Sequence, residues 1–301
     1  MKILLTGSNG FLGKVMLQTL SIKNEVYTLN RNSSDYNVDL SRDDCFFDQK
    51  FDLVIHAAGM AHSIPLSEEE ISMYFEINVN GTENLLYALS GSSLPKQFVF
   101  ISTVAVYGEF NGSLINEQSQ LKAIDPYGRS KIQAEQRVVQ WCSKNDVIMT
   151  IFRLPLVVGL DPPGNLGKMI NGLRKGFYFN VAGGSAKKSM VLASDVAKFV
   201  LKASEVGGIY NLTDRYHPSF FELSNNLSNQ LGRSKPKNLP FWFANFLAKC
   251  GDILGSRAPL NSEKLIKITS TLTFDDSKAF EVFGWRPNPV LMGFWISEKK
   301  L

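Results

Sequence analysis

Tyr127 and Lys131 are the first pair of residues whose types and spacing could do chemistry. They lie four positions apart in the segment Pro126–Lys144, and that spacing places a phenol and an ammonium group on one face of a helix. A neighbouring positive charge favours phenolate and lowers the pKa of a tyrosine from its usual value of about 10. Such a tyrosine can take a proton from a hydroxyl group or return one to a ketone. Taken alone, the pair is more typical of an ordinary helix surface, so its interpretation depends on the surrounding sequence.

Thr103 adds a third polar group to this pair. It directly follows the apolar run Gln97–Ser102, which predicts a buried strand. A residue at the carboxyl end of a parallel strand lies at the edge of the sheet where ligands bind. The Thr103 hydroxyl can share the hydrogen bond to a reacting oxygen, so Thr103 and Tyr127 are candidates for both catalysis and substrate contact.

Three glycines, Gly7, Gly10 and Gly13, follow the apolar run Lys2–Thr6 at intervals of three residues. A lone glycine motif is weak evidence, but this one follows a predicted strand and opens a predicted helix. The first glycine allows a tight turn, the second lets the backbone approach a pyrophosphate, and the third lets the helix pack on the strand. The helix N-terminus then offers free N–H groups to the phosphates. The context favours a nucleotide-binding loop over a plain turn.

Strand-like and helix-like segments alternate over the first half of the chain. The predicted strands are Lys2–Thr6, Glu25–Asn30, Asp52–His56, Gln97–Ser102 and Val147–Arg153. The predicted helices are Phe11–Ile22, Glu68–Leu89 and Pro126–Lys144. Such alternation builds a parallel sheet with helices on both faces. We predict an α/β protein with a Rossmann-type, doubly wound parallel sheet.

The alternation breaks down after about residue 160, where short strands mix with helices and prolines and glycines cluster. We predict a Rossmann-type domain over residues 1–160. A smaller α+β lobe that binds the substrate follows over residues 161–301, with about residues 186–212 returning to the larger domain. Four aromatic residues of this lobe are expected in its core or in a contact between the two parts: Phe241, Trp242, Phe243 and Phe246.

Composition is that of an ordinary globular protein, with 301 residues of which 44% are hydrophobic and 20% charged. The net charge of +4 comes with no run of five or six like charges, so nucleic acid is not an expected partner. Ile3–Leu5 is too short for a signal peptide, and Phe241–Leu254 is interrupted by two charged residues and cannot span a bilayer. We expect a soluble, cytoplasmic protein with no membrane partner.

Cysteine and histidine are too few and too scattered for a disulfide framework or a metal site. The residues concerned are Cys45, Cys142, Cys250, His56, His62 and His217.

Several motifs, in order, resemble the extended branch of the short-chain dehydrogenase/reductase superfamily, the NAD-dependent epimerase/dehydratase family. The resemblance runs from Lys2 to about Pro287. The matching stretches are TGSNGFLG from Thr6, Asn30-Arg31, Asp39-Leu40, His56-Ala57-Ala58-Gly59, Asn78 within NVNGTENLL, Ser-Thr-x-x-Val-Tyr-Gly from Ser102, Tyr127-Gly-Arg-Ser-Lys131 and Arg153-Leu-Pro-Leu-Val-Val-Gly159.

This resemblance implies a catalytic set of Thr103, Tyr127 and Lys131 and a nicotinamide cofactor. The residues that it implies for cofactor binding are Gly7, Asn9, Gly10, Phe11, Leu12, Gly13, Asn30, Arg31, Asp39, Leu40, His56, Ala57, Ala58, Asn78, Ser102, Tyr127, Lys131 and Leu154. Asn30 stands where an acidic residue would bind the ribose of NAD, and Arg31 could hold the 2′-phosphate of NADP. NADP is favoured over NAD, although Arg31 could equally stack on adenine or be solvated.

The substrate candidates come from the smaller lobe. Residues 162–176, PPGNLGKMINGLRKG, resemble the family segment that leads a helix toward a nucleoside diphosphate, which makes Asn165 and Lys168 candidates. Lys188 lies where many relatives place an arginine that grips the diphosphate; solvated lysines before a strand would give the same pattern. The resemblance implies a nucleotide-sugar substrate, most simply a UDP-sugar.

The expected activity is hydride transfer at C4 of that sugar, by an epimerase or a 4-ketoreductase, which the motifs do not separate. Val104 and Ala105 stand where 4,6-dehydratases of the family carry an Asp-Glu pair; neither can exchange a proton, so dehydration is not expected. Two alternatives remain open. One is a non-catalytic NAD(P)-binding sensor or scaffold, against which the retained Tyr127 and Lys131 argue. The other is a small-ketone reductase, in which Asn165 and Lys188 would hardly matter. The resemblance also implies a homodimer, formed through the helix that carries Tyr127 and its neighbour.

Overall fold

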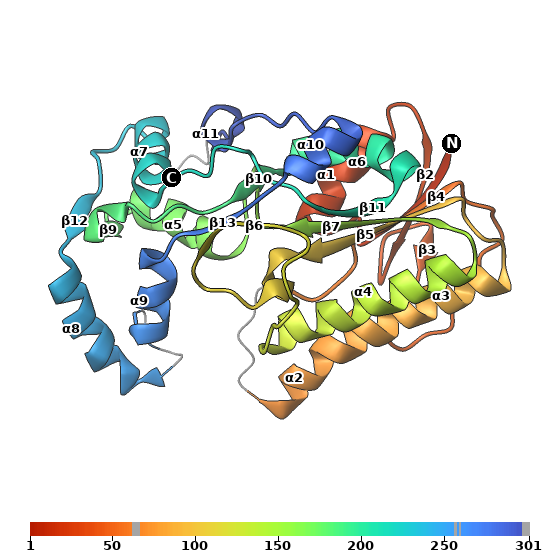
Figure 1. The fold of residues 1–301 in the computed structure, drawn as a ribbon, viewed down its shortest axis with the longest axis horizontal. Coiled ribbons are helices and arrows are strands. Elements are labelled where there is room, and N and C mark those ends of the chain that lie inside the picture. The colour runs from red at the N-terminus through yellow and green to blue at the C-terminus, as the bar shows by residue number, and fades with distance from the viewer. Residues whose placement is uncertain (62–66, 256–257, 259, 297–301) are drawn as a thin grey trace.

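A seven-stranded parallel sheet forms the centre of the computed structural model, which describes residues 1–61, 67–255, 258 and 260–296 (Figure 1). The strand order is β11-β7-β5-β4-β1-β2-β3. Its strands are β1 (Lys2–Thr6), β2 (Glu25–Asn30), β3 (Tyr36–Asn37), β4 (Leu53–His56), β5 (Gln97–Thr103), β7 (Ile148–Leu154) and β11 (Gly208–Asn211). The winding direction reverses between β1 and β4, which is the doubly wound arrangement with its ligand crevice at the carboxyl ends of those strands. The predicted α/β, Rossmann-type fold is confirmed. His62 lies outside the described residues.

Helices bury both faces of this sheet. The core on one face includes side chains of α1 (Phe11–Leu20), α6 (Ala193–Val206) and α10 (Ser277–Phe283), and the core on the other those of α3 (Gly81–Gly91) and α4 (Pro126–Lys144). The side chains of β1 alternate between the two cores: Ile3 and Leu5 pack into one core, and Leu4 packs into the other. Because both faces are covered, β1 is apolar throughout instead of alternating.

The helix α4 has the limits that the sequence predicts. The carboxylate of Asp125 accepts a hydrogen bond from the Gly128 N–H at 2.9 Å, and Pro126 occupies the first turn, where its missing N–H has no cost. Tyr127 and Lys131 therefore start the helix one turn apart, at the end that adjoins the carboxyl edge of the sheet.

The predicted helix Glu68–Leu89 is wrong in one respect, because the structure divides it. α2 (Glu68–Phe75) is followed by a π-helical turn, Glu76–Asn80, before α3 begins. Hydrophobic periodicity does not reveal such a turn. It inserts extra backbone that places Asn78 in the interior, and π turns of this kind often occur at functional sites.

The smaller lobe adjoins the carboxyl ends of the strands, since β7 leads directly into β8 (Leu156–Val158), which pairs with β10 (Met190–Leu192) (Figure 1). Its other strand pairs are β9 (Phe179–Val181) with β12 (Lys237–Leu239) and β6 (Gly112–Ile115) with β13 (Leu272–Phe274). Its helices are α5 (Gly164–Arg174), α7 (Phe220–Gln230), α8 (Phe241–Asp252), α9 (Ser262–Thr269) and α11 (Val290–Gly293). Short 3-10 turns cover Val104–Tyr107 and Ala182–Gly184. Although they come late in the chain, β11 pairs within the large sheet and α6 packs on one of its faces. The domain boundary at residue 160 stays a prediction.

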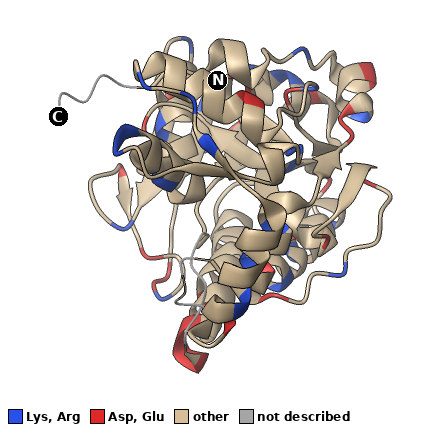
Figure 2. Ribbon diagram, turned by 90° about the vertical axis from the view of Figure 1, so that its left-hand side faces the viewer, with Lys and Arg blue, Asp and Glu red and all other residues tan. Residues whose placement is uncertain are grey.

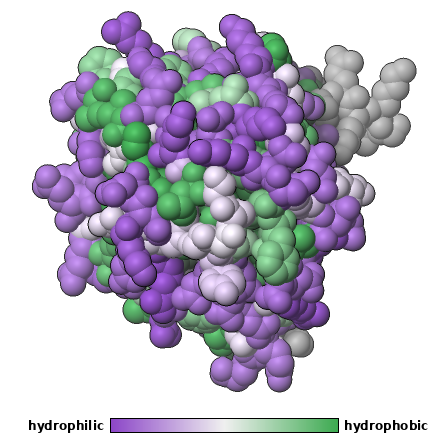
Figure 3. Space-filling model, turned by 90° about the vertical axis from the view of Figure 1, so that its right-hand side faces the viewer, coloured by the Kyte–Doolittle hydropathy of each residue, from purple (hydrophilic) through white to green (hydrophobic). Residues whose placement is uncertain are grey.

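The expectation that the aromatic cluster of α8 is core is wrong. Phe241, Trp242, Phe243 and Phe246 are all exposed. Figure 2 looks onto the lobe end of the molecule with charged residues coloured, and the acidic first turn of α2 lies at its lower tip. Figure 3 shows the opposite end, where hydrophobic side chains lie between hydrophilic ones. No helix within the described residues combines the length and apolar character needed to cross a bilayer.

Candidate active site

The glycine-rich loop makes a tight turn that requires glycine at two of its three glycine positions. Gly7 has φ +71°, and a Cβ there would lie 2.6 Å from the Ala58 nitrogen, while a Cβ on Gly13 would lie 2.1 Å from the Gly7 oxygen. These two glycines are therefore required by packing alone. Gly10 is exposed, and a Cβ there would meet only the Gly7 oxygen, at 3.1 Å. The first turn of α1 has no side-chain cap and no acidic residue, so its N–H groups suit an anion.

Asn30 holds this loop in place from the end of β2. Its Nδ2 donates to Ser8 Oγ at 2.7 Å, and its Oδ1 accepts from the Asn9 N–H at 3.2 Å. Asn30 thus acts as a support, which leaves the exposed Arg31 as the cation beside the loop. Arg31 makes no ion pair among the described residues. Although burial opposes the effect, hydrogen bonds from Ser41 and the charge of Arg31 hold the pKa of Asp39 below its usual value.

His56 lies at the end of β4 and is almost fully buried in a chain of hydrogen bonds. The Ala58 N–H donates to Thr6 Oγ1 at 3.1 Å, and Thr6 Oγ1 lies 2.7 Å from His56 Nδ1. Nε2 of His56 lies 3.0 Å from Thr82 Oγ1, which donates its own proton to the Asn78 carbonyl at 2.7 Å. Thr82 must therefore accept from His56, so the ring is neutral with its proton on Nε2. Both ring nitrogens have partners inside the protein, so the assignment of His56 to the cofactor site stays a prediction that does not depend on these two atoms.

This buried ring predicts an acid-sensitive fold. Burial, with a smaller effect of Lys131, lowers the pKa of His56 to about 3 from a usual value of 6.5. The unfolded chain binds the proton first as the pH falls, so the contribution of His56 to stability is full above about pH 6.5 and is lost toward pH 3. We expect the free energy of unfolding to fall by several kcal/mol across this window. Denaturant unfolding as a function of pH measures it.

His56→Gln should flatten this dependence, at a cost of about 1–3 kcal/mol at pH 7 for the broken hydrogen bonds. His217→Gln is the matched comparison, because that ring is only partly buried, and it should change the slope less. An unchanged acid slope in His56→Gln would contradict the assignment.

Asn78, in the π-helical turn, holds the segment that follows β4 in place by hydrogen bonds. Its Oδ1 accepts from the Met60 N–H at 2.7 Å, and its Nδ2 donates to the Met60 carbonyl at 3.1 Å and to Ser130 Oγ at 2.9 Å. Both amide protons are used inside the protein, so the contacts give Asn78 a supporting role. Gly59 lies in the same segment, and a Cβ there would come within 2.9 Å of Asn78 Oδ1.

The three candidate catalytic residues come together at the carboxyl end of β5. The Thr103 side chain lies close enough to Tyr127 to lower the pKa of the phenol, and its hydroxyl accepts from the Ala105 N–H at 3.1 Å. Lys131 is buried below them. Its Nζ donates to the Ile101 carbonyl at 2.7 Å and lies 4.1 Å from the centre of the Phe100 ring.

The pKa values of this pair differ from the sequence-based expectation. Burial raises the pKa of Tyr127 to about 12, although the hydrogen bond with Thr103 opposes it. Burial lowers the pKa of Lys131 to about 7, against the opposing charge of Glu135. The predicted lowering of the tyrosine pKa is therefore wrong for this arrangement, in which Tyr127 keeps its proton at neutral pH. Tyr127 is poised as an acid, and Lys131 is the group that titrates near neutrality.

A buried ion pair beneath these residues was missed by sequence reasoning. Glu135 accepts from Ser102 Oγ at 2.5 Å and from Nη2 of Arg153 at 2.7 Å, and Nη1 of Arg153 lies 3.2 Å from the Tyr107 hydroxyl. That hydroxyl donates to Asn211 Oδ1 at 2.8 Å. This network fixes α4 to β5 and β7. Two signals could have indicated it: Glu135 is eight residues from Tyr127 on one helix face, and an arginine inside an apolar strand needs a partner.

Two more residues assigned to the cofactor have interior roles. The Ser102 hydroxyl is buried on Glu135, and the Leu40 side chain packs in the core while its carbonyl accepts from Asn84 at 2.8 Å. The assignment of both residues to the cofactor site stays a prediction. The half-buried residues Phe11, Leu12, Ala57 and Ala58 border the loop and β4, and Leu154 is buried in the core.

The substrate candidates are dispersed. Asn165 and Lys168 are exposed on α5, and no contact among the described residues joins them to Thr103 or Tyr127. Lys188 is half-buried, and burial lowers the pKa of its ammonium to about 8. It makes no ion pair among the described residues.

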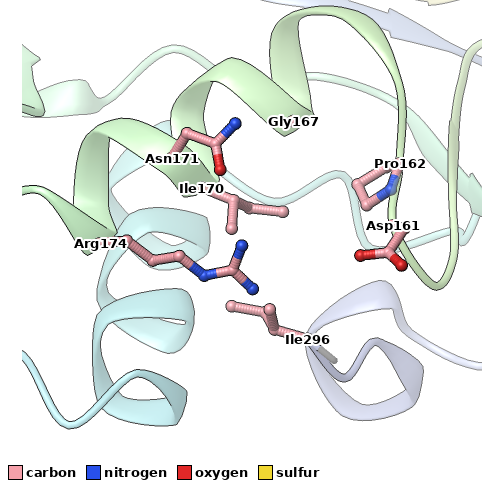
Figure 4. Close-up of a pocket in the computed structure, with 7 residues that line it drawn as sticks. All are labelled: Asp161, Pro162, Gly167, Ile170, Asn171, Arg174 and Ile296. Atoms are coloured by element: carbon pink, nitrogen blue, oxygen red, sulfur yellow. The ribbon is translucent and has the colours of Figure 1, made fainter. Parts of the chain in front are cut away.

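A small hollow of about 140 Å³ lies on α5, and Figure 4 shows the Arg174 side chain reaching across it toward Ile296. Asp161 and Pro162 line its other side. None of the candidate catalytic residues lines this hollow, so we do not assign the reaction to it. Within the described residues, no group of three or more His, Cys, Asp or Glu side chains could hold a metal ion.

Comparisons with known proteins agree with this geometry. Residues 3–213 match the family model described as "NAD dependent epimerase/dehydratase family". The chain is 28% identical to the N-acetyl-alpha-D-glucosaminyl-diphospho-ditrans,octacis-undecaprenol 4-epimerase of Escherichia coli O157:H7, over 92% of this chain and 88% of that protein. It is 26% identical to a UDP-glucose 4-epimerase of Vibrio cholerae, over 96% and 92%. Among solved structures, the complex of the Thermus thermophilus UDP-glucose 4-epimerase with NAD superimposes with a TM-score of 0.74 at 23% identity, covering 95% of this chain and 94% of that one.

Proposed function

This chain belongs to the NAD-dependent epimerase/dehydratase family, and we propose that it is a 4-epimerase of sugars carried on a diphosphate. A nicotinamide cofactor bound at the glycine-rich loop supplies the hydride acceptor and donor. The single observation that carries the proposal is the Thr103–Tyr127 contact above the buried Lys131, at the sheet edge that also presents the loop.

Tyr127 is proposed as the acid and base at the sugar C4 oxygen. In the oxidation, Tyr127 would start as the phenolate that a charged Lys131 stabilises and would take the proton of the C4 hydroxyl, while the nicotinamide would supply the hydride chemistry. In the reduction of the ketone from its other face, Tyr127 would return the proton to the C4 oxygen, and the configuration at C4 would be inverted. Thr103 would share the hydrogen bond to this oxygen, and Lys131 would stabilise the phenolate when charged.

The substrates that name the two relatives share a diphosphate. One relative is named for a sugar on UDP and the other for a sugar joined through a diphosphate to undecaprenol. Lys188 is the proposed cation for it, because a half-buried ammonium without an ion-pair partner in the described structure is poorly compensated until an anion binds. Asn165 and Lys168 remain weaker proposals for the same group. Sugars on both kinds of carrier are therefore tested.

The test is turnover of defined substrates by the purified protein. UDP-glucose, UDP-N-acetylglucosamine and N-acetylglucosaminyl-diphospho-undecaprenol are each incubated with NAD or NADP, and the C4 epimers are measured by NMR. Inversion at C4 of one of them is expected. Bound cofactor without turnover of any of them would favour the non-catalytic alternative.

A 4-ketoreductase is the second candidate, and Arg31 favours it. A single reduction consumes NADPH, and Arg31 adjoins the loop with its guanidinium free of ion pairs among the described residues, as a 2′-phosphate site requires. We therefore propose NADP over NAD as the preferred cofactor. Consumption of NADPH with a UDP-4-keto-6-deoxy sugar would identify this activity.

Arg31→Asp should shift the cofactor preference from NADP(H) toward NAD(H). The guanidinium is lost and a carboxylate able to bind the ribose hydroxyls takes its place, so we expect the ratio of Kd values for NADPH and NADH to move at least tenfold toward NADH. Fluorescence titration of both cofactors measures it. Arg42→Asp is the matched control, because Arg42 is a second exposed arginine near Asp39. If both variants shifted the ratio equally, the preference would come from the overall positive charge near the loop and not from a phosphate site at Arg31.

A further inference from the structure

The helix α8 is built with its apolar side outward. Ala244, Ala248 and Gly251 form its inner face, against Leu265 of α9, and a Cβ on Gly251 would lie 1.9 Å from the Leu260 oxygen. Small residues thus let α8 lie closely on the lobe. The large side chains of the same helix are left on the other side.

That outer side is unusually exposed for its residue types. Trp242 is 72% exposed, Phe246 59% and Ile253 88%, and these positions repeat at the spacing of one helix face. Phe241, Leu247 and Leu254 widen the stripe. Single exposed apolar residues are ordinary, but a contiguous stripe marks an interaction surface.

Positive charge surrounds the stripe. Residues 231–254 contain four basic side chains and one acidic one, for a local net charge of +3. Arg233, Lys235 and Lys237 lie exposed just before the helix, and Lys249 lies on it. The one acidic residue, Asp252, is bound to Ser262 of α9 at 2.6 Å and faces away from the stripe.

We propose that α8 is an interfacial helix that lies in the headgroup layer of an anionic lipid membrane. Tryptophan, phenylalanine and leucine on one face, with lysine and arginine along the border, is the pattern that such helices require. The stripe is ~18 Å long and one helix wide, small beside the roughly 800 Å² that each partner buries in a stable protein complex. The helix does not span the membrane, and this surface departs from the sequence-based expectation of no membrane partner.

The surface has a consequence for the substrate, which rests on the proposed function. α8 lies at the far end of the lobe that carries the diphosphate candidates (Figure 1). An enzyme held at a membrane by this lobe would meet sugar diphosphates whose carrier is a lipid anchored in that membrane. We therefore infer that the carrier is a polyprenol in place of a nucleoside.

The first experiment measures binding of the full chain to vesicles of phosphatidylcholine, with and without about a third phosphatidylglycerol. Cys250 lies on the stripe and is exposed, whereas burial raises the pKa of the Cys45 and Cys142 thiols, so a polarity-sensitive maleimide dye labels Cys250 selectively. We expect co-sedimentation and a blue-shifted dye signal with the anionic vesicles. Absence of both overturns the proposal.

Two variants and a matched control define the surface. W242E/F246E should reduce partitioning at least tenfold, and K235Q/K237Q about fivefold per lysine on anionic vesicles only. The control I22E/F46E changes two equally exposed apolar residues of the larger domain and should bind like the native chain. Equal losses in the control overturn the proposal. A second result would also overturn it: no vesicle binding, together with light scattering that shows a dimer in the native chain and a monomer in W242E/F246E. The exposed face of α8 would then be a dimer interface.

Activity separates this proposal from the proposed function. W242E/F246E should lose at least tenfold in rate on the vesicle-borne undecaprenol-linked sugar and remain unchanged on any water-soluble substrate. Equal rates for variant and native chain on the vesicle-borne sugar overturn the polyprenol inference. Absence of all turnover in the native chain contradicts the proposed function, while the vesicle-binding result still decides the surface.

Discussion

Tyr127→Phe is expected to lower kcat by about 10³-fold while the protein still folds and binds its cofactor. General acid–base catalysis by a positioned side chain contributes about 10²–10⁴-fold, and the variant removes only the hydroxyl that would move the proton. Thr103 keeps a partner in the Ala105 N–H, so the loss leaves no buried polar group unsatisfied. Steady-state kinetics on the substrate that the native chain turns over, with cofactor binding measured separately, tests this.

Tyr74→Phe is the matched control. Its ring is buried on α2, and its centre lies 6.0 Å from that of Tyr127, so the change deletes a neighbouring phenol and leaves the hydroxyl of Tyr127 in place. We expect less than a tenfold effect on kcat. Retention of native kcat in Tyr127→Phe would refute the acid–base assignment, whatever the control does.

The fold followed from sequence wherever one physical rule dominated. β1 and β2 have the predicted limits because apolar runs of strand length are bounded by turn residues. α4 has its predicted limits because Asp125 and Pro126 define its start without help from the rest of the chain. The π-helical turn at Glu76–Asn80 was not predictable, because one extra residue in a helix leaves the apolar pattern almost unchanged.

The candidate site was predictable by residue type but not by which atoms are already occupied. His56, Asn78 and Ser102 lie beside the proposed crevice, yet their polar atoms are hydrogen-bonded within the protein. A motif cannot show this, because it records that a residue matters and not whether it acts on a ligand or on its neighbours. The same limit explains the pKa of Tyr127, which depends on burial that no spacing reveals.

The exposed face of α8 is the reverse case. Aromatic residues in an interrupted apolar segment predict a core, because burial is their usual fate. The structure turns Ala244 and Ala248 inward instead, since only small residues allow the close approach to α9. The amphipathic pattern is visible in the sequence alone, but which side faces solvent depends on the neighbour against which the helix packs.

Lys131→Met should lower activity and stabilise the fold. Burial lowers the pKa of Lys131 to about 7 in the folded protein, against 10.5 when solvated, so the folded state disfavours the charged amine. The unfolded chain binds more protons between these values, and stability therefore rises with pH from about 7 to about 10.5. Below pH 7 the whole cost of burial is present. Methionine removes it and loses only the bond to the Ile101 carbonyl, for a net gain on the order of a few kcal/mol at neutral pH.

The same titration sets the sign of the pH dependence of catalysis. After Tyr127 gives its proton to a ketone, a charged Lys131 stabilises the phenolate, and a neutral one does not. The rate of ketone reduction should therefore decline as the pH rises through about 7, and Lys131→Met should show a low rate without this step. Thermal unfolding of both proteins from pH 6 to 10 measures the stability half, and the gap between them should close as the pH rises. A less stable Lys131→Met at neutral pH would mean that the ammonium is held by interactions stronger than its burial cost.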